Sequence, residues 1–252
     1  MSDLITVQGV VISAMPVGEY DKRIVLLTRE RGKISAFAKG ARRQNSPFMA
    51  AADPFVFGNF TLYEGRTSYN LNQVSVTHHF VELATMQPGV YYGYYFLELA
   101  DYFGKEGTDE KEMMNLLYVT IKAILNPHIE DRLVRCIYEL RTMVIQGVMP
   151  QLFQCAGCGR ELTEEENGEL FFSQDEHGIL CADCSRMAMD RKRISEAALY
   201  AMRYIAVSPL AKLYTFTVRD DVLRELERHI YRYTELNTDK RFKSLEILEL
   251  MR

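Results

Sequence analysis

The chain has 252 residues and a mass of 29.1 kDa, which is long enough for two modest domains and a small metal-binding module. Its hydrophobic fraction of 48% and charged fraction of 25% are those of an ordinary globular protein. The sequence has no apolar run of about 18 residues and no signal-peptide pattern at its N-terminus, so we expect a cytoplasmic protein without a membrane span.

The net charge of −4 hides a basic N-terminal part. Residues 1–79 carry nine Lys/Arg and six Asp/Glu, a balance of +3, which leaves −7 for the rest of the chain. Within residues 22–43, eight basic side chains accompany a single acidic one. Because an acidic protein repels polyanions as a whole, this local basic cluster indicates a surface that binds a polyanion.

Residues 4–76 have the pattern of short β-strands, because β-branched and aromatic residues alternate with polar ones between turn signals. The five predicted strands are residues 4–12, 24–28, 33–39, 54–63 and 69–76. Five short antiparallel strands in so few residues predict a small closed barrel of the oligonucleotide/oligosaccharide-binding (OB) type. An SH3-like barrel would give a similar pattern.

The third predicted strand separates two kinds of side chain by alternation. One face carries Ile34, Ala36 and Ala38, and the other carries Lys33, Ser35, Phe37 and Lys39. The first set suits a barrel interior. The second places an aromatic ring between cations, and single-stranded nucleic acid requires both, for its bases and its phosphates. The alternative is that Phe37 is a core residue under the following loop, which carries Arg42 and Arg43.

After His79 the period of the apolar residues changes from 2 to 3.6, which predicts helices. The predicted helices are residues 88–103, 110–125, 131–146, 195–207 and 219–236. A cysteine-containing segment separates the third helix from the fourth. We therefore expect an α+β multidomain protein whose α-helical domain is interrupted by a metal module. The expected boundaries are 1–79 for the barrel, 80–150 and 187–252 for the two helical parts, and 151–186 for the module.

Four cysteines form two C-x-x-C pairs, Cys155 with Cys158 and Cys181 with Cys184, separated by 22 residues. This spacing is typical of a tetrahedral four-thiolate zinc site. Four thiolates leave no ligand position for water, so the predicted zinc ion is structural. Disulfides would require an oxidising compartment, and a thioredoxin-like redox pair would require one C-x-x-C in a βαβ pattern. Neither condition is indicated here.

The sequence contains none of the common catalytic or nucleotide-binding motifs, such as G-x-S-x-G, the P-loop, G-x-G-x-x-G or H-E-x-x-H. We therefore predict a protein that is not an enzyme and has no catalytic residues. An enzyme that uses scattered residues is the alternative.

Residues 18–28 (GEYDKRIVLLT) and 38–43 (AKGARR), with Gly32-Lys33 between them, resemble the RecO family of recombination mediators. The order of barrel, helices, zinc module and further helices is similar too, so the resemblance covers essentially the whole chain. It implies an OB-fold that binds single- and double-stranded DNA and anneals complementary strands in the nucleoid. It also implies partnership with RecR and with the tail of single-stranded-DNA-binding protein, and thereby loading of RecA onto coated strands.

The resemblance places DNA contacts on basic barrel and loop residues and supplies no catalytic residue. The matching positions, with Phe37 added from the strand pattern, are Lys22, Arg23, Lys33, Phe37, Lys39, Arg42 and Arg43. Binding an acidic-hydrophobic tail requires an apolar groove flanked by cations, for which Arg132, Arg203 and Lys212 are candidates.

Two alternative functions do not depend on the resemblance. The first is an RNA-binding or transcription-associated OB/zinc protein, because charge and stacking do not distinguish DNA from RNA. The second is a hydrolase on a zinc-supported scaffold.

Overall fold

The computed structural model describes residues 3–162 and 169–251. They form two compact units. The first extends to Leu125 and is completed by the segment from Phe242 onward, and the second runs from Asn126 to Arg241. The boundaries at residues 79, 150 and 186 remain a prediction from the sequence. Among the described residues, no helix has the length and hydropathy that a membrane span requires.

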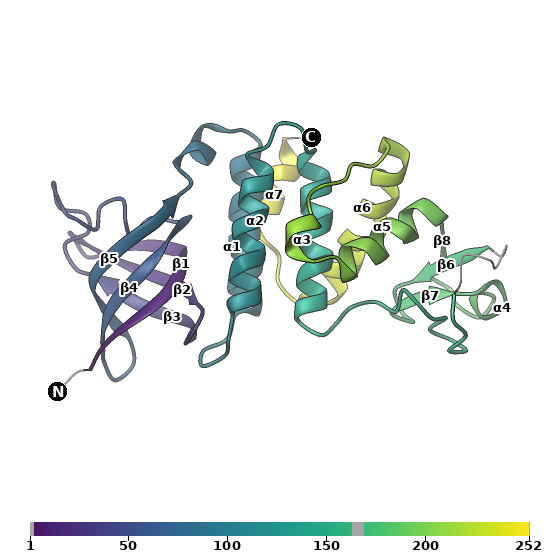
Figure 1. The fold of residues 1–252 in the computed structure, drawn as a ribbon, viewed down its shortest axis with the longest axis horizontal. Helices are drawn as coiled ribbons and strands as arrows, with labels where there is room; N and C mark the ends of the chain where they lie inside the picture. The colour runs from purple at the N-terminus through teal and green to yellow at the C-terminus, as the bar shows by residue number, and fades with distance from the viewer. Residues whose placement is uncertain (1–2, 163–168, 252) are drawn as a thin grey trace. The chain divides into compact units, whose positions relative to one another are not determined.

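The first unit begins with five strands that close into a barrel (Figure 1). They are β1 (Leu4–Val17), β2 (Asp21–Thr28), β3 (Gly32–Ala38), β4 (Val56–Glu64) and β5 (Tyr69–His79). The order around the barrel is β1-β2-β3-β5-β4, and β4 pairs with β1 to close it. All pairs are antiparallel except the short parallel pairing of β3 with β5. The predicted OB barrel is thus confirmed.

Strand β1 is longer than the predicted residues 4–12 because it serves two neighbours. It pairs with β4 from Leu4 to Val10 and with β2 from Gly9 to Val17. At the overlap the backbones come close, since a Cβ on Gly9 would lie 2.8 Å from the carbonyl oxygen of Leu27. A glycine is therefore required where β1 passes from one neighbour to the other.

Alternating apolar side chains fill the barrel. Ile34, Ala36 and Ala38 of β3 are at most 2% exposed, and the residues between them are half-buried. The predicted facing of this strand is therefore confirmed, and Phe37 lies on its outer side. Phe60 of β4 is completely buried and is the largest fully buried side chain of the barrel core.

Helices complete both units (Figure 1). The first unit contains η1 (Val81–Thr85), α1 (Gly89–Phe103), α2 (Lys111–Ile124) and α7 (Lys243–Leu250). The second contains α3 (Asp131–Ile145), α5 (Glu196–Val207), η2 (Leu210–Lys212) and α6 (Asp220–Leu236). Helix α1 packs against α2 and α7, and α3 packs against α5 and α6. The five predicted helices are confirmed to within one residue at each end. Helix α7 was not predicted, because two helical turns carry little periodicity.

A small sheet separates α3 from α5 along the chain. Its strands are β6 (Leu170–Ser173), β7 (Gly178–Leu180) and β8 (Lys192–Ile194), in the order β7-β6-β8, and the short helix α4 (Ala182–Ser185) follows β7. The sheet packs against α6 through Phe172, whose ring centroid lies 5.2 Å from that of the buried His229. Gln174 Nε2 also donates to the carbonyl oxygen of His229 at 3.1 Å. The metal module therefore interrupts the helical domain in sequence and packs on it in space.

We expect Phe60→Ala to destabilise the protein by about 3–5 kcal/mol, because it removes a buried ring from the barrel and leaves a cavity. The matched control is Tyr63→Ala on the same strand, where the side chain is 43% exposed and the expected change is within about 0.5 kcal/mol. The measurement is the free energy of unfolding from denaturant titration. Equal effects of the two substitutions would contradict the assignment of the core.

Candidate nucleic-acid interface and metal centre

The loop that follows β3 is hydrogen-bonded to the turn between β1 and β2. The backbone N–H of Gly40 donates to Asp21 Oδ1 at 2.7 Å, and the backbone N–H of Arg42 donates to the Tyr20 carbonyl at 2.8 Å. The Arg42 guanidinium donates to the carbonyl oxygens of Gly18 and Glu19, both at 3.2 Å. These bonds fix the loop and the turn as one end of the barrel.

This end of the barrel exposes a group that we call the tip cluster: Tyr20, Lys39, Arg42 and Arg43. The guanidinium carbon of Arg43 lies 4.9 Å from the centroid of the Tyr20 ring, which is 43% exposed. The cluster thus combines cations with an aromatic face. Sequence reasoning missed Tyr20, since the turn and the basic loop are 19 or more residues apart along the chain and meet only in the fold.

Two of the predicted contact residues are paired with carboxylates. Lys22 Nζ donates to the Met49 carbonyl at 2.9 Å and to the Asp53 carboxylate at 2.6 Å. Lys33 Nζ donates to the Asp101 carbonyl at 2.5 Å and lies 3.4 Å from the carboxylate of the same residue. Lys22 thereby holds the β3–β4 loop, and Lys33 holds the end of α1. Both charges are partly compensated within the unit.

Arg23 and Phe37 are register partners on neighbouring strands β2 and β3, and Phe37 also pairs with Asn70 of β5. Arg23 is exposed and donates to Ser35 Oγ at 3.1 Å. Phe37 is half-buried, so part of its ring faces solvent beside a guanidinium group. The outer face of the barrel therefore continues the chemistry of the tip cluster.

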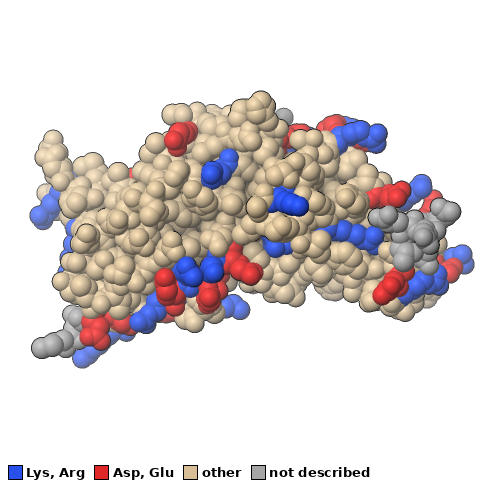
Figure 2. Space-filling view, viewed as in Figure 1, with Lys and Arg blue, Asp and Glu red and all other residues tan. Residues whose placement is uncertain are grey.

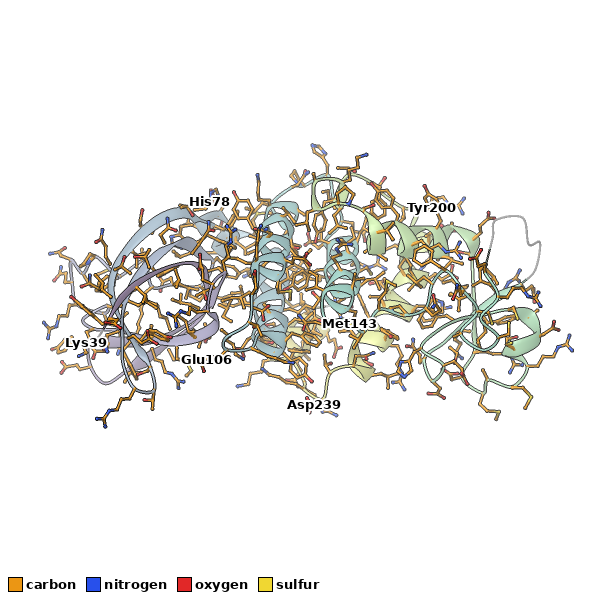
Figure 3. The ribbon with its side chains drawn as sticks, turned by 60° about the horizontal axis from the view of Figure 1, so that its bottom comes forward. Lys39, His78, Glu106, Met143, Tyr200 and Asp239 are labelled. Carbon is orange, nitrogen blue, oxygen red and sulfur yellow. The ribbon has the colours of Figure 1, made fainter. Side chains whose placement is uncertain are left out.

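A cavity of about 410 Å³ lies beside this face, lined among others by Arg23, Lys33, Asp101 and Glu106. Its carboxylates come from α1 and the following turn. Figure 3 shows Glu106 and Lys39 at different ends of the barrel. On the face drawn in Figure 2, basic and acidic side chains are interspersed without one broad basic patch. The tip cluster therefore carries three cations and no carboxylate, whereas the lining of the cavity carries two cations and two carboxylates.

The predicted metal ligands come together in the second unit. The Sγ atoms of Cys155, Cys158, Cys181 and Cys184 all lie within 4.8 Å of one another. The backbone N–H of Cys181 donates to Cys155 Sγ at 3.3 Å, and the sulfurs of Cys158 and Cys181 are 4.0 Å apart. Such a cluster of thiols could hold one metal ion.

Two glycines allow this close approach. A Cβ on Gly157 would lie 3.0 Å from the Cβ of Cys184 and 3.1 Å from its sulfur. Gly159 has φ of +73°, which residues with side chains rarely adopt.

Burial alone would raise the pKa of Cys155, but backbone N–H groups of Cys181, Cys158 and Gly157 outweigh it and lower the pKa to about 6. These N–H groups thus favour a thiolate at Cys155, which is the form that binds metals.

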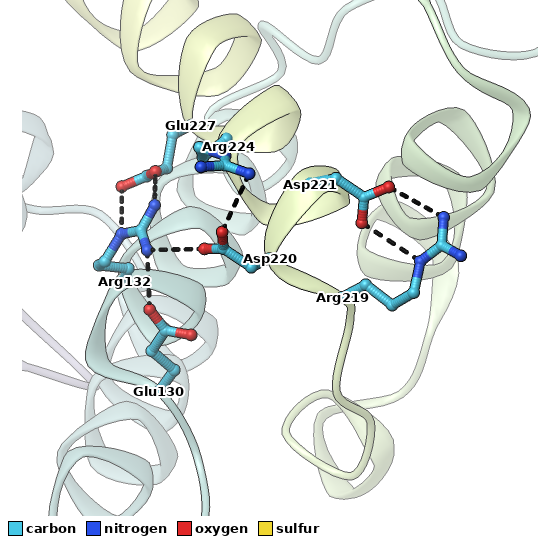
Figure 4. Close-up of polar contacts among 7 residues, drawn as sticks. All are labelled: Glu130, Arg132, Arg219, Asp220, Asp221, Arg224 and Glu227. Carbon is cyan, nitrogen blue, oxygen red and sulfur yellow. Dashed lines mark hydrogen bonds and ion pairs between the residues drawn. The ribbon is translucent and has the colours of Figure 1, made fainter.

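Of the three cations expected to flank a peptide groove, Arg132 is enclosed by carboxylates (Figure 4). Its guanidinium forms ion pairs with Glu227, with Glu130 at 2.9 Å and with Asp220 at 3.3 Å. Arg203 donates to the carbonyl oxygens of Leu152 and Leu162, whereas Lys212 is exposed. Arg132 and Arg203 therefore stabilise the second unit.

These features define an OB-fold protein with a helical second unit and a four-cysteine cluster that could hold a metal ion. Comparison with family models matches residues 1–80 to the N-terminal part of recombination protein O and residues 89–246 to its C-terminal part. The chain therefore belongs to the RecO family, as the resemblance implied.

Similar proteins include the DNA repair protein RecO of Symbiobacterium thermophilum, 30% identical over 99% of this chain and 98% of that protein. Those of Alkaliphilus metalliredigens and Bacillus pumilus are 29% and 27% identical over 97% and 98% of this chain, and the alignments cover 98% and 94% of those proteins.

We expect purified protein to contain about one metal ion per chain, and Cys155→Ser to lose it, because three sulfurs do not complete the tetrahedral site. The melting temperature should fall as well, since metal binding and folding are coupled. The control is Cys136→Ser, which changes a buried thiol outside the cluster and should retain the ion. The measurement is the metal content per chain, determined by mass spectrometry under reducing conditions. Equal metal contents in the two variants would contradict the assignment of Cys155 as a metal ligand.

Proposed function

We propose that this protein is a recombinational-repair mediator that binds and anneals single-stranded DNA and is not an enzyme. The observation that carries the proposal is the tip cluster, in which Arg43 lies over the exposed ring of Tyr20, and Lys39 and Arg42 are exposed on the same loop as Arg43. Cations and aromatic faces bind single strands because they contact phosphates and bases at the same time. The DNA repair proteins to which the chain is similar support DNA over RNA as the ligand.

The proposed strand path begins at the tip cluster and continues over Phe37 and Arg23. At the cavity, the carboxylates of Asp101 and Glu106 offset the charges of Lys33 and Arg23, so phosphates would be attracted less strongly there than at the tip cluster. Of the predicted contacts, Lys39, Arg42 and Arg43 therefore have the leading part. Lys22 and Lys33 contribute mainly by holding the β3–β4 loop and the end of α1, since Asp53 and Asp101 compensate their charges.

We also propose that the metal is one structural zinc ion. Zinc–sulfur bonds of about 2.3 Å in a tetrahedron place the sulfurs about 3.8 Å apart. The 4.0 Å between Cys158 and Cys181 is close to that value, and four soft thiolates are a donor set that zinc prefers. Bound there, zinc would neutralise part of the thiolate charge and hold the small sheet together.

The proposed partners are RecR and the acidic-hydrophobic tail of single-stranded-DNA-binding protein, with RecA acting downstream, in the cytoplasm at the nucleoid. Helix α5 supports a tail-binding surface, because Tyr200 and Val207 are 63% and 67% exposed on it. Tyr200 points away from the helix in Figure 3. The exposed Lys212 lies in η2, which follows α5, and its backbone carbonyl accepts a hydrogen bond from the Tyr204 hydroxyl. The surface would thus supply apolar contacts and one cation.

The experiment that tests the function is annealing of complementary strands coated with single-stranded-DNA-binding protein. We expect the wild-type protein to accelerate annealing and the variant with Arg42→Ala and Arg43→Ala to be slower, because it lacks two phosphate contacts. The log–log salt dependence of single-strand affinity should become shallower by about 1.4, at about 0.7 per phosphate. The control is Arg224→Ala with Arg232→Ala, which removes two exposed charges from α6. A wild-type protein without annealing activity would overturn the proposal.

Phe37→Ala should weaken single-strand binding by about 1–3 kcal/mol, because it removes a ring on which a base can stack. The salt dependence should stay unchanged, and duplex binding should suffer less, since paired bases hide their faces. Affinities from fluorescence anisotropy and melting temperatures are measured together. A large loss of melting temperature without selective loss of single-strand affinity would show that the ring only packs against the barrel.

A further inference from the structure

The turn between α4 and β8 exposes two methionines. Met187 and Met189 are 87% and 96% exposed, whereas Ala188 between them is 7% exposed. Two large apolar side chains are thus directed into solvent on either side of a buried residue. Neither side chain belongs to the four-cysteine cluster or to the core of the barrel.

The turn is anchored to the metal knuckle at its start. The backbone N–H of Met187 donates to the carbonyl oxygen of the metal ligand Cys184 at 3.2 Å. The Arg191 guanidinium donates to the Ala188 carbonyl at 2.9 Å and closes the turn. The methionines are therefore presented from a fixed backbone.

The end of the turn is anchored as well, through Asp190. Its carboxylate accepts from Ser173 Oγ and from the backbone N–H of Gln174, both at 2.6 Å, and from that of Asp175 at 3.1 Å. The one acidic charge of the turn is thus directed toward β6 and the turn that follows it.

The charge that remains on the turn is positive. Residues 186–193 contain four basic residues and one acidic residue. Arg186 and Arg193 form exposed ion pairs with Asp183 at 3.5 Å and with Glu169 at 3.3 Å. Exposed pairs of this kind contribute little and exchange readily. Lys192, on the edge strand β8, and Arg191 are exposed next to the methionines.

We propose that Met187, Met189, Arg191 and Lys192 form a second DNA-binding surface, which contacts duplex DNA. This inference rests on the proposed function and adds a second surface to it. The cations would contact backbone phosphates. Methionine is among the apolar side chains that proteins insert between base steps from the minor groove. Barrel and turn would then hold single strand and duplex on one chain, which favours annealing.

An acidic-hydrophobic peptide is the other class of partner with matching chemistry. Such a peptide requires an apolar groove on the protein. Side chains that are 87% and 96% exposed project into solvent and do not line a groove. A groove that accepts these side chains must therefore be on the partner, and duplex DNA has such a groove.

The first test uses the wild-type protein. Hydrogen peroxide oxidises exposed methionines, and peptide mass spectrometry gives the rate at each site with and without a 20-base-pair duplex. We expect the duplex to slow oxidation of Met187 and Met189 several-fold and to leave the 37%-exposed Met149 unchanged. Unchanged rates at Met187 and Met189 would overturn the inference. Protection by polyglutamate and not by duplex would assign the surface to a protein partner.

The second test uses a double variant that carries both Arg191→Ala and Lys192→Ala. Its control is the double variant that carries both Arg224→Ala and Arg232→Ala. The first variant should make the salt dependence of duplex affinity shallower by about 1.8, at about 0.9 per phosphate, and should leave single-strand affinity unchanged. The control should match the wild type, and metal content and melting temperature verify the fold. If the wild type binds duplex and the first variant binds it equally well, the inference is wrong while the proposed function stands. A wild type that binds no DNA removes both.

Discussion

Strand β1 is shared between two neighbours, and the barrel depends on this sharing. Only because β1 leaves β4 and continues along β2 does the sheet close, and Gly9 permits the close backbone contact where the strand changes partner. Closure gives each strand an inner and an outer face. The antiparallel pairing of β2 with β3, in which Lys22 lies opposite Ala38, places the turn before β2 and the loop after β3 at the same end, where Tyr20 meets Arg43.

Stability and binding use different residues of the first unit. Burial of one ring such as Phe60 contributes about 3–5 kcal/mol, whereas an exposed ion pair contributes about 0–1 kcal/mol. The barrel therefore does not need its surface cations for folding. Lys22 and Lys33 differ, since they hold a loop and the end of α1 through carbonyl oxygens and carboxylates, and Arg42 also holds the turn before β2 through two carbonyl oxygens.

The proposed zinc ion would compensate for the small size of the sheet in the second unit. Three strands of three or four residues bury too little apolar surface to be stable alone. A metal ion on the four thiolates would link the two knuckles, and Phe172 packs the sheet against His229 of α6. The same knuckle fixes the turn that carries Met187 and Met189, so the proposed duplex surface would depend on the metal.

The sequence alone determined whatever depends on local periodicity and spacing: the OB-type strands, the inward facing of Ile34, Ala36 and Ala38, five helices to within a residue, and the four cysteines. Family membership also followed from local motifs. Only the tertiary structure decided which cations are occupied, because Asp53 and Asp101 lie 31 and 68 residues from Lys22 and Lys33. Only the tertiary structure shows that Arg43 contacts Tyr20 and that α7 packs in the first unit. Such contacts depend on how the chain closes on itself, and no local pattern records that.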